Sequence, residues 1–173
     1  IHSPVVGEQG MVVSQNAIAS EVGADILRGG GNAVDAAVAI GFALAVTLPR
    51  AGNIGGDGFM LVHDAKSGEQ VFLDFRSVAP KAATLAMFVD NKGQESPIAS
   101  RGYLAPSVPG TVAGLHMAHK KFGKLPWSDV VAPAIALARD GVVLTPDEAF
   151  VFGWNSHRQM LVAQDPRKDH ILG

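Results

Sequence analysis

The sequence contains no cysteine, which excludes disulfide bonds, thiolate nucleophiles, iron–sulfur clusters and cysteine-based zinc sites. Charged residues are also scarce, at 17% of the 173 residues, and they nearly cancel to a formal charge of -2. This balance argues against binding to nucleic acid or to an anionic membrane surface. Hydrophobic residues reach 47%, so more side chains need burial than a freestanding domain of this size usually hides. The composition therefore predicts a permanent protein partner.

A hydrophobic run long enough to cross a membrane is missing as well. The most apolar stretch, residues 33–48, is shorter than the roughly 20 residues that span a bilayer, and it contains Asp35 and Gly41. We therefore expect a buried helix there. The chain begins with Ile1, as it would after removal of a targeting peptide or after trimming.

Glycine and proline divide the chain into short elements of both types. A strand is predicted at residues 10–14 and a helix at 17–28, where apolar residues recur at every fourth position and three glycines follow. Asn32 can cap a second helix, residues 33–46, whose first turn carries Asp35, a residue type that favours the helix dipole. This helix is apolar nearly all round, which predicts tight packing between two layers.

A β-hairpin is predicted over residues 59–75, with its turn at 64–68. The glycine-rich loop 52–58 leads directly into it. The loops at both ends of the hairpin are the expected functional edge. Residues 90–101 are predicted to be an exposed loop, so residues 1–173 have no internal domain boundary.

Three further helices are predicted in the second half of the chain, at residues 111–122, at 128–139 and from 146 to about 154. Ser128 should cap the second of them, and Pro133 should kink or delay it. Thr145 and Glu148 have the spacing of a capping box at the start of the third.

The glycine-rich loop could bring backbone N–H groups close to an anion. It lacks the Lys-Ser/Thr pair of a phosphate-binding loop, and it precedes a strand, whereas a dinucleotide fingerprint precedes a helix. Nucleotide binding is therefore disfavoured. Two interpretations remain: the glycines let a strand enter a crowded sheet, or they shape a substrate pocket.

Arg76 directly follows an apolar strand, where its guanidinium could clamp a carboxylate in a bidentate manner. The alternative is a structural ion pair with Asp74 or with a distant carboxylate, and spacing alone favours that pair. His116 and His119 could share a metal ion, but no third ligand is nearby, so we predict surface histidines.

Nucleophiles with a recognisable local sequence are absent. No Gly-x-Ser-x-Gly elbow occurs, and Ile1 offers no side-chain oxygen or sulfur. The residues taken singly therefore indicate a glycine-rich α/β chain with a carboxylate site at Arg76 as its candidate function.

Six short phrases, taken in order, are more specific than any of them alone. They are residues 10–14 (GMVVS), 30–39 (GGNAVDAAVA), 52–60 (GNIGGDGFM), 74–80 (DFRSVAP), 108–114 (VPGTVAG) and 132–141 (APAIALARDG). Together they resemble the γ-glutamyltransferase (γ-glutamyltranspeptidase) family from about residue 7 to residue 147.

The resemblance implies an α/β (α+β) fold, the four-layer αββα sandwich of N-terminal-nucleophile hydrolases. Such an enzyme is made as one precursor that cuts itself into a large and a small subunit. This chain would be the N-terminal portion of the large subunit, and its partners would be the rest of that subunit and the small subunit. Bacterial relatives are commonly periplasmic or secreted.

The implied reaction cleaves γ-glutamyl amide bonds of glutathione-like substrates and transfers the γ-glutamyl group to water or an amine. The family's nucleophile is the threonine that begins the small subunit, so no catalytic residue, metal or organic cofactor is expected in this chain. None of its threonines matches that motif; they are Thr47, Thr84, Thr111 and Thr145.

The resemblance gives Arg76 the role of holding the α-carboxylate of the γ-glutamyl group. The chain departs from the family pattern at two positions beside it, with Ser77 where glutamate is usual and Asp57 where glycine is usual. These departures keep a glutaryl or cephalosporin acylase on the same fold as an alternative. The alternative of another class is a noncatalytic module that binds a small carboxylate through Arg76 and the loop 52–58.

Overall fold

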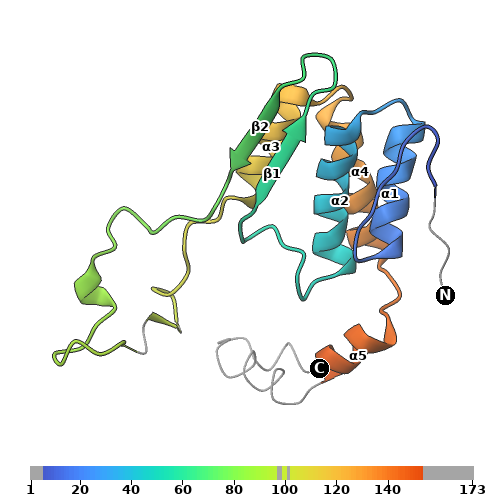
Figure 1. Ribbon diagram of the computed structural model, residues 1–173. Coiled ribbons are helices and arrows are strands. Elements are labelled where there is room, and N and C mark those ends of the chain that lie inside the picture. The colour runs from blue at the N-terminus through green and yellow to red at the C-terminus, as the bar shows by residue number, and fades with distance from the viewer. Residues whose placement is uncertain (1–5, 97–98, 101, 154–173) are drawn as a thin grey trace.

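The computed structural model describes residues 6–96, 99–100 and 102–153 (Figure 1). The chain combines helices and strands, as the sequence predicts, with two helices before a pair of strands and the other helices after it. The elements are α1 (Ala17–Arg28), α2 (Ala33–Thr47), β1 (Phe59–His63), β2 (Gln70–Asp74), the short 3-10 helix η1 (Leu85–Met87), α3 (Thr111–Phe122), α4 (Trp127–Asp140) and α5 (Pro146–Gly153). In the part of the chain described, no helix has both the length and the apolarity needed to cross a bilayer.

Helix α2 forms the centre of the molecule, where it packs against α1, α3 and α4. Val38, Ala39 and Ala43 are fully buried, as predicted for a helix that is apolar all round. Small residues allow the close approach of its neighbours. A Cβ atom on Gly23 of α1 would lie 2.4 Å from the Cδ1 atom of Ile40, so the two helices touch where glycine leaves room.

The predicted hairpin is present as an antiparallel pair, with Phe59 opposite Asp74 and His63 opposite Gln70. Alternate side chains point to opposite faces. One face packs on the helices through Leu73 and its neighbours. The other face carries apolar side chains that are more than half exposed, namely Phe59, Leu61 and Phe72. The hairpin is therefore apolar on both faces but covered on only one.

Two predicted caps are confirmed. Asn32 and Asp35 form a capping box at the start of α2. Thr145 and Glu148 make the reciprocal bonds of a capping box at α5, because the Glu148 N–H donates to the Thr145 hydroxyl oxygen while the Thr145 N–H donates to the Glu148 carboxylate. These local signals involve residues three positions apart, which explains why the sequence reveals them.

The prediction for the start of α4 is wrong. The helix begins at Trp127 after Pro126, so Ser128 lies inside its first turn, where its hydroxyl donates to Asp129 at 3.1 Å. Pro133 does not delay the helix, which starts six residues earlier and continues to Asp140. Burial of Val130 and Ala134 on either side of the proline holds these turns against the core.

The strand predicted at residues 10–14 is also wrong. This segment runs beside α1, where Val12 packs against the core, and it pairs with no strand in the described part of the chain. A β-type sequence needs a pairing partner, and no described strand lies beside this segment. Residues 90–95 of the predicted loop are exposed as expected, and η1 precedes them on a segment that projects from the helices (Figure 1). The predicted end of the last helix, near residue 154, lies outside the described residues.

Asp35 is a fully buried carboxylate that joins three parts of the fold. Its Oδ2 atom accepts the N–H of Asn32 at 2.9 Å, which completes the cap of α2. The same carboxylate accepts the N–H groups of Lys124 at 3.0 Å and Leu125 at 3.3 Å, in the turn between α3 and α4. Gly123 belongs to this contact, since a Cβ atom there would lie 2.9 Å from Oδ1 of Asp35.

We predict that Asp35→Ala lowers the free energy of unfolding of the full protein by about 2–4 kcal/mol, because three backbone N–H groups lose their acceptor. The matched control is Asp25→Ala, which removes an exposed carboxylate of α1 that pairs with Arg28 at 2.6 Å. That change should stay within about 0.5 kcal/mol. Urea unfolding measures both, and an equal effect of the two variants would contradict the role of Asp35.

Candidate functional site

Arg76 lies two residues beyond the end of β2, with its side chain 64% exposed. Its Nε atom is 3.4 Å from Oδ2 of Asp57, in the glycine-rich loop. Asp74 is not the ion-pair partner; its Oδ1 atom accepts the backbone N–H of Arg76 at 2.9 Å. Of the two pairings that the sequence left open, the structure thus has the one with a distant carboxylate, which the hairpin brings to the strand end. The role of Arg76 as a carboxylate clamp stays a prediction.

Asp57 is held by the residue that follows the arginine. Its Oδ2 atom accepts the hydroxyl of Ser77 at 2.5 Å and the backbone N–H of Ser77 at 3.1 Å. These two hydrogen bonds, and then the charge of Arg76, hold the pKa of the Asp57 carboxyl below its ordinary value. The carboxylate is therefore charged at neutral pH, and its interactions are lost only as the pH falls through that lowered pKa.

The glycine-rich loop is also tied to the start of α3. The Gly56 carbonyl oxygen accepts the N–H groups of Gly110 at 2.8 Å and Thr111 at 3.1 Å. The side-chain oxygen of Asn53 accepts the Gly56 N–H at 2.8 Å and the Thr111 hydroxyl at 2.7 Å. Three segments far apart in the sequence therefore meet around Arg76. Asn53 and Thr111 were not singled out as functional by the sequence, because nothing local marks a contact over 58 positions.

Phe75, the residue before Arg76, lies in a socket made by three glycines. A Cβ atom on Gly58 would lie 2.7 Å from its ring, one on Gly114 would lie 2.0 Å from its Cγ atom, and one on Gly110 would lie 2.0 Å from its backbone oxygen. Only glycine leaves space at these positions. The socket fixes the backbone immediately before the arginine.

The glycines of the loop 52–58 differ in what surrounds them. A Cβ atom on Gly52 would lie 2.0 Å from the Leu44 carbonyl oxygen, whereas one on Gly55 would meet nothing within 4 Å. Gly52 is therefore crowded by the last turn of α2 and Gly58 by the Phe75 ring, while the interpretation that the glycines let a strand enter a crowded sheet stays a prediction. The interpretation that they shape a substrate pocket stays a prediction.

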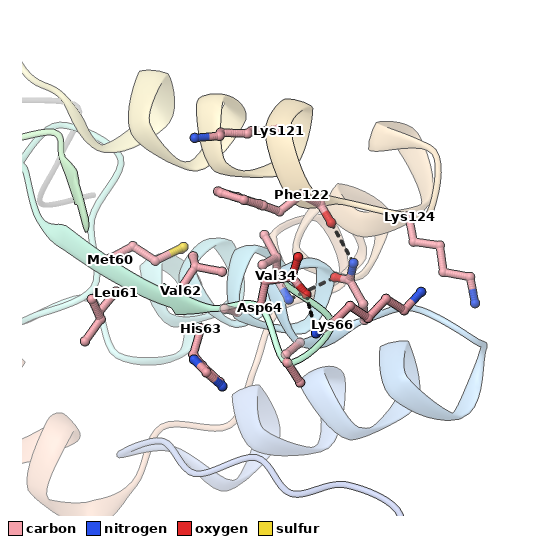
Figure 2. A pocket seen from close by; sticks show the side chains of 14 residues that line it. Val34, Met60, Leu61, Val62, His63, Asp64, Lys66, Lys121, Phe122 and Lys124 are labelled. Carbon is pink, nitrogen blue, oxygen red and sulfur yellow. Dashed lines mark hydrogen bonds between the residues drawn. The ribbon is translucent and has the colours of Figure 1, made fainter. Parts of the chain in front are cut away.

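A cavity of about 730 Å³ lies toward the hairpin turn, between β1, the start of α2 and the end of α3 (Figure 2). Apolar side chains such as Met60 and Phe122 line it, with the exposed Lys66, Lys121 and Lys124 at its rim. Arg76 does not line this cavity. The candidate site and the cavity thus lie at opposite ends of the hairpin.

The prediction that both histidines of α3 are surface residues is wrong for His119. Its side chain is 12% exposed, its ring packs 5.1 Å from that of Trp127, and its Nε2 atom is 2.9 Å from the Leu125 carbonyl oxygen. His116 is exposed and contacts the same Trp127 ring at 5.0 Å. Within the described ranges, no three histidine, aspartate or glutamate side chains are grouped to hold a metal ion.

Comparisons with known proteins agree on one family. A model of the family described as Gamma-glutamyltranspeptidase matches residues 19–172. The glutathione hydrolase proenzyme of Escherichia coli K12 is 52% identical over 145 residues, which are 83% of this chain and 25% of that protein. The chain therefore spans about a quarter of the length of this curated relative.

Solved structures give the same result. The Helicobacter pylori γ-glutamyltranspeptidase has a TM-score of 0.82 at 44% identity, covering 94% of this chain and 45% of that one. A cephalosporin acylase from Bacillus halodurans is more distant, with a TM-score of 0.70 at 33% identity, covering 86% and 28% respectively.

The socket around Phe75 predicts that an alanine at Gly114 changes the stability of the protein in the opposite direction from an alanine at an ordinary helical glycine. At an ordinary helix position Gly→Ala stabilises by about 0.5–1 kcal/mol, but Gly114→Ala should destabilise the full protein by about 1–3 kcal/mol through overpacking. Gly55→Ala, in open space, is the matched control and should change stability by less than about 0.5 kcal/mol. Thermal unfolding measures both, and stabilisation by Gly114→Ala would contradict the socket.

Proposed function

Because the chain belongs to the γ-glutamyltranspeptidase family, we propose that it is the N-terminal portion of the large subunit of an enzyme that cleaves γ-glutamyl amide bonds. The acyl group passes to water or to an amine, with glutathione-like molecules as substrates. The proposal is supported by a family match over nearly the whole chain and by relatives described as glutathione hydrolase proenzymes. In this proposal residues 1–173 are one unit without an internal domain boundary.

The finer fold in this proposal is the four-layer αββα sandwich. The described helices cover one face of the hairpin, and the opposite face exposes Phe59, Leu61 and Phe72, with the two phenylalanine rings stacked 5.7 Å apart. An exposed apolar patch of this kind indicates a surface that another element covers. We assign that cover to the second sheet, built from the remainder of the large subunit and from the small subunit.

The nucleophile in this proposal is a threonine at the start of the small subunit. Two threonines of this chain have other contacts: Thr111 is buried and donates to Asn53, and the Thr145 hydroxyl donates to Glu148. The small-subunit threonine would lose its hydroxyl proton to its own α-amine and attack the γ-carbonyl carbon. The C–N bond then breaks, the proton leaves with the amine product, and water or a second amine releases the acyl group.

Arg76 is the residue of this chain that we assign to the substrate. The observation that carries this assignment is its place at the end of β2, where the side chain is largely exposed and Nε faces Asp57. Its two Nη nitrogens have no partner among the residues that the structure describes, so they are free to take both oxygens of an α-carboxylate. The chain contributes binding and orientation, while the small subunit contributes the chemistry.

The two alternative functions, an acylase and a noncatalytic binding module, have weaker support. The acylase relative is less similar than the γ-glutamyltranspeptidase, at 33% against 44% identity. Neither the Escherichia coli relative nor the Helicobacter pylori structure is described as a noncatalytic carboxylate-binding protein. A periplasmic or secreted location, which the family resemblance implies, stays a prediction.

The Arg76 assignment predicts a graded loss of activity in the assembled enzyme. Arg76→Ala and Arg76→Gln should lower kcat/KM by roughly 10- to 150-fold, since a hydrogen bond to a charged group contributes about 1.5–3 kcal/mol. Arg76→Lys should lose less, because it keeps the charge without the planar fork. Most of the loss should be a raised KM, because the clamp holds the ground and transition states alike.

The control for Arg76 is a substrate amidated at its α-carboxyl group. It should be poor with the parent enzyme and should lose little more with Arg76→Ala. Steady-state kinetics on both substrates test the role of Arg76. If the Arg76→Ala enzyme hydrolyses the free acid as well as the parent enzyme does, another residue binds the α-carboxylate.

In the proposed enzyme, the nucleophile and the oxyanion donors belong to the small subunit. We therefore predict that this 173-residue chain alone does not hydrolyse a γ-glutamyl anilide. Co-expression with the remainder of the precursor, including a threonine-led small subunit, should restore turnover. The measurement is release of the aniline by each preparation, and turnover by the pure chain would contradict the assignment of roles.

A further inference from the structure

One carboxylate oxygen beside Arg76 accepts two hydrogen bonds and also makes an ion-pair contact. Oδ2 of Asp57 accepts the hydroxyl and the N–H of Ser77 and lies 3.4 Å from Nε of Arg76. The Asp57 side chain is 25% exposed, whereas that of Arg76 is 64% exposed. The aspartate is therefore the anchored member of the pair, and the arginine is the member that reaches into solvent.

The backbone of Arg76 is held independently of this pair. Its N–H donates to Asp74, and Phe75 before it lies in the glycine socket. What remains free is the arginine side chain, with several rotatable bonds. A contact at Nε restricts those rotations, while both Nη nitrogens stay available to a ligand.

We propose that Asp57 and Ser77 are positioning residues for Arg76: Ser77 fixes the Asp57 carboxylate, and Asp57 holds Nε so that the two Nη nitrogens face the substrate's α-carboxylate. This inference rests on the function proposed above for Arg76. In this arrangement the carboxylate that contacts Arg76 is supplied from the glycine-rich loop.

Asp57 also repels a bound carboxylate, so the two effects have to be compared. Ordering an arginine side chain that nothing holds weakens binding by up to about 30-fold. Asp57 assists binding only if this ordering effect exceeds the repulsion, and the sign of the KM change in Asp57→Asn measures which effect is larger. We expect a net gain of about 3- to 10-fold in substrate affinity from Asp57.

The test uses the full, processed enzyme and a γ-glutamyl anilide with a free α-carboxylate. Asp57→Asn keeps a side-chain oxygen to accept from Ser77 but removes the charge that faces Arg76. KM should rise about 3- to 10-fold with kcat within about twofold, and the α-amide analogue should show no change in KM. A merely structural role would alter both substrates equally.

Ser77 provides the second variant. Ser77→Ala removes the hydroxyl donor but keeps the backbone N–H, so KM for the free acid should rise about twofold to fourfold. Ser77→Thr keeps the hydroxyl and should retain the parent KM. If Asp57→Asn fails to fold or to process, the contrast between these two Ser77 variants decides the proposal.

The chain offers a matched control in the hairpin turn. Asp64 accepts the Ser67 hydroxyl at 3.1 Å and the Lys66 N–H at 2.9 Å, which is the same type of Asp–Ser contact at the other end of the hairpin. Asp64→Asn should therefore leave KM for both substrates unchanged.

The outcomes separate this inference from the proposed function. If Arg76→Ala raises KM for the free acid but Asp57→Asn does not, the positioning role is wrong and the function stands. A lower KM in Asp57→Asn also overturns the inference, since Asp57 would then compete with the substrate. If Arg76→Ala has no effect, the carboxylate clamp and its positioning residues are both wrong.

Discussion

The buried carboxylate of Asp35 is the contact on which the arrangement of helices depends. It caps α2 and at the same time accepts backbone N–H groups from the turn that joins α3 to α4. Asn32 strengthens the connection, because its side-chain amide donates to the Phe122 carbonyl oxygen at 2.6 Å. A polar group in a core is stable only when its bonds are satisfied, so these bonds fix where the helices meet.

Helix α3 carries this constraint to the candidate site. The carbonyl oxygen of its last residue, Phe122, accepts from Asn32, and the turn that follows it donates to Asp35. At its other end, the N–H groups of Gly110 and Thr111 donate to the Gly56 carbonyl oxygen. Gly114 on the same helix receives Phe75, the neighbour of Arg76. Arg76 therefore lies on an irregular segment but is backed by a packed helix. This combination of a loop residue on a rigid scaffold is typical of binding sites.

The site differs from the core in how its charges are held. Asp35 is fully buried and accepts hydrogen bonds from the backbone N–H groups of Asn32, Lys124 and Leu125, so it organises the chain. Asp57 lies at the surface, takes its strongest hydrogen bonds from Ser77 and faces a cation that remains exposed. Bonds at the surface contribute less stability but leave a charged group available to a ligand. Aspartate thus stabilises the fold at position 35 and contacts the charged side chain of the candidate site at position 57.

The sequence by itself determined the features that depend on near neighbours: helix α1, the caps of α2 and α5, the hairpin, and the phrases that identify the family. Glycine stops, capping pairs and alternating apolar residues act over a few positions, so they can be read along the chain. Tertiary structure decided that Asp57 pairs with Arg76, that α4 begins before Ser128, and that residues 10–14 lie beside a helix. Each of these depends on what packs against a segment from elsewhere in the chain, and that contact exists only once the chain has folded.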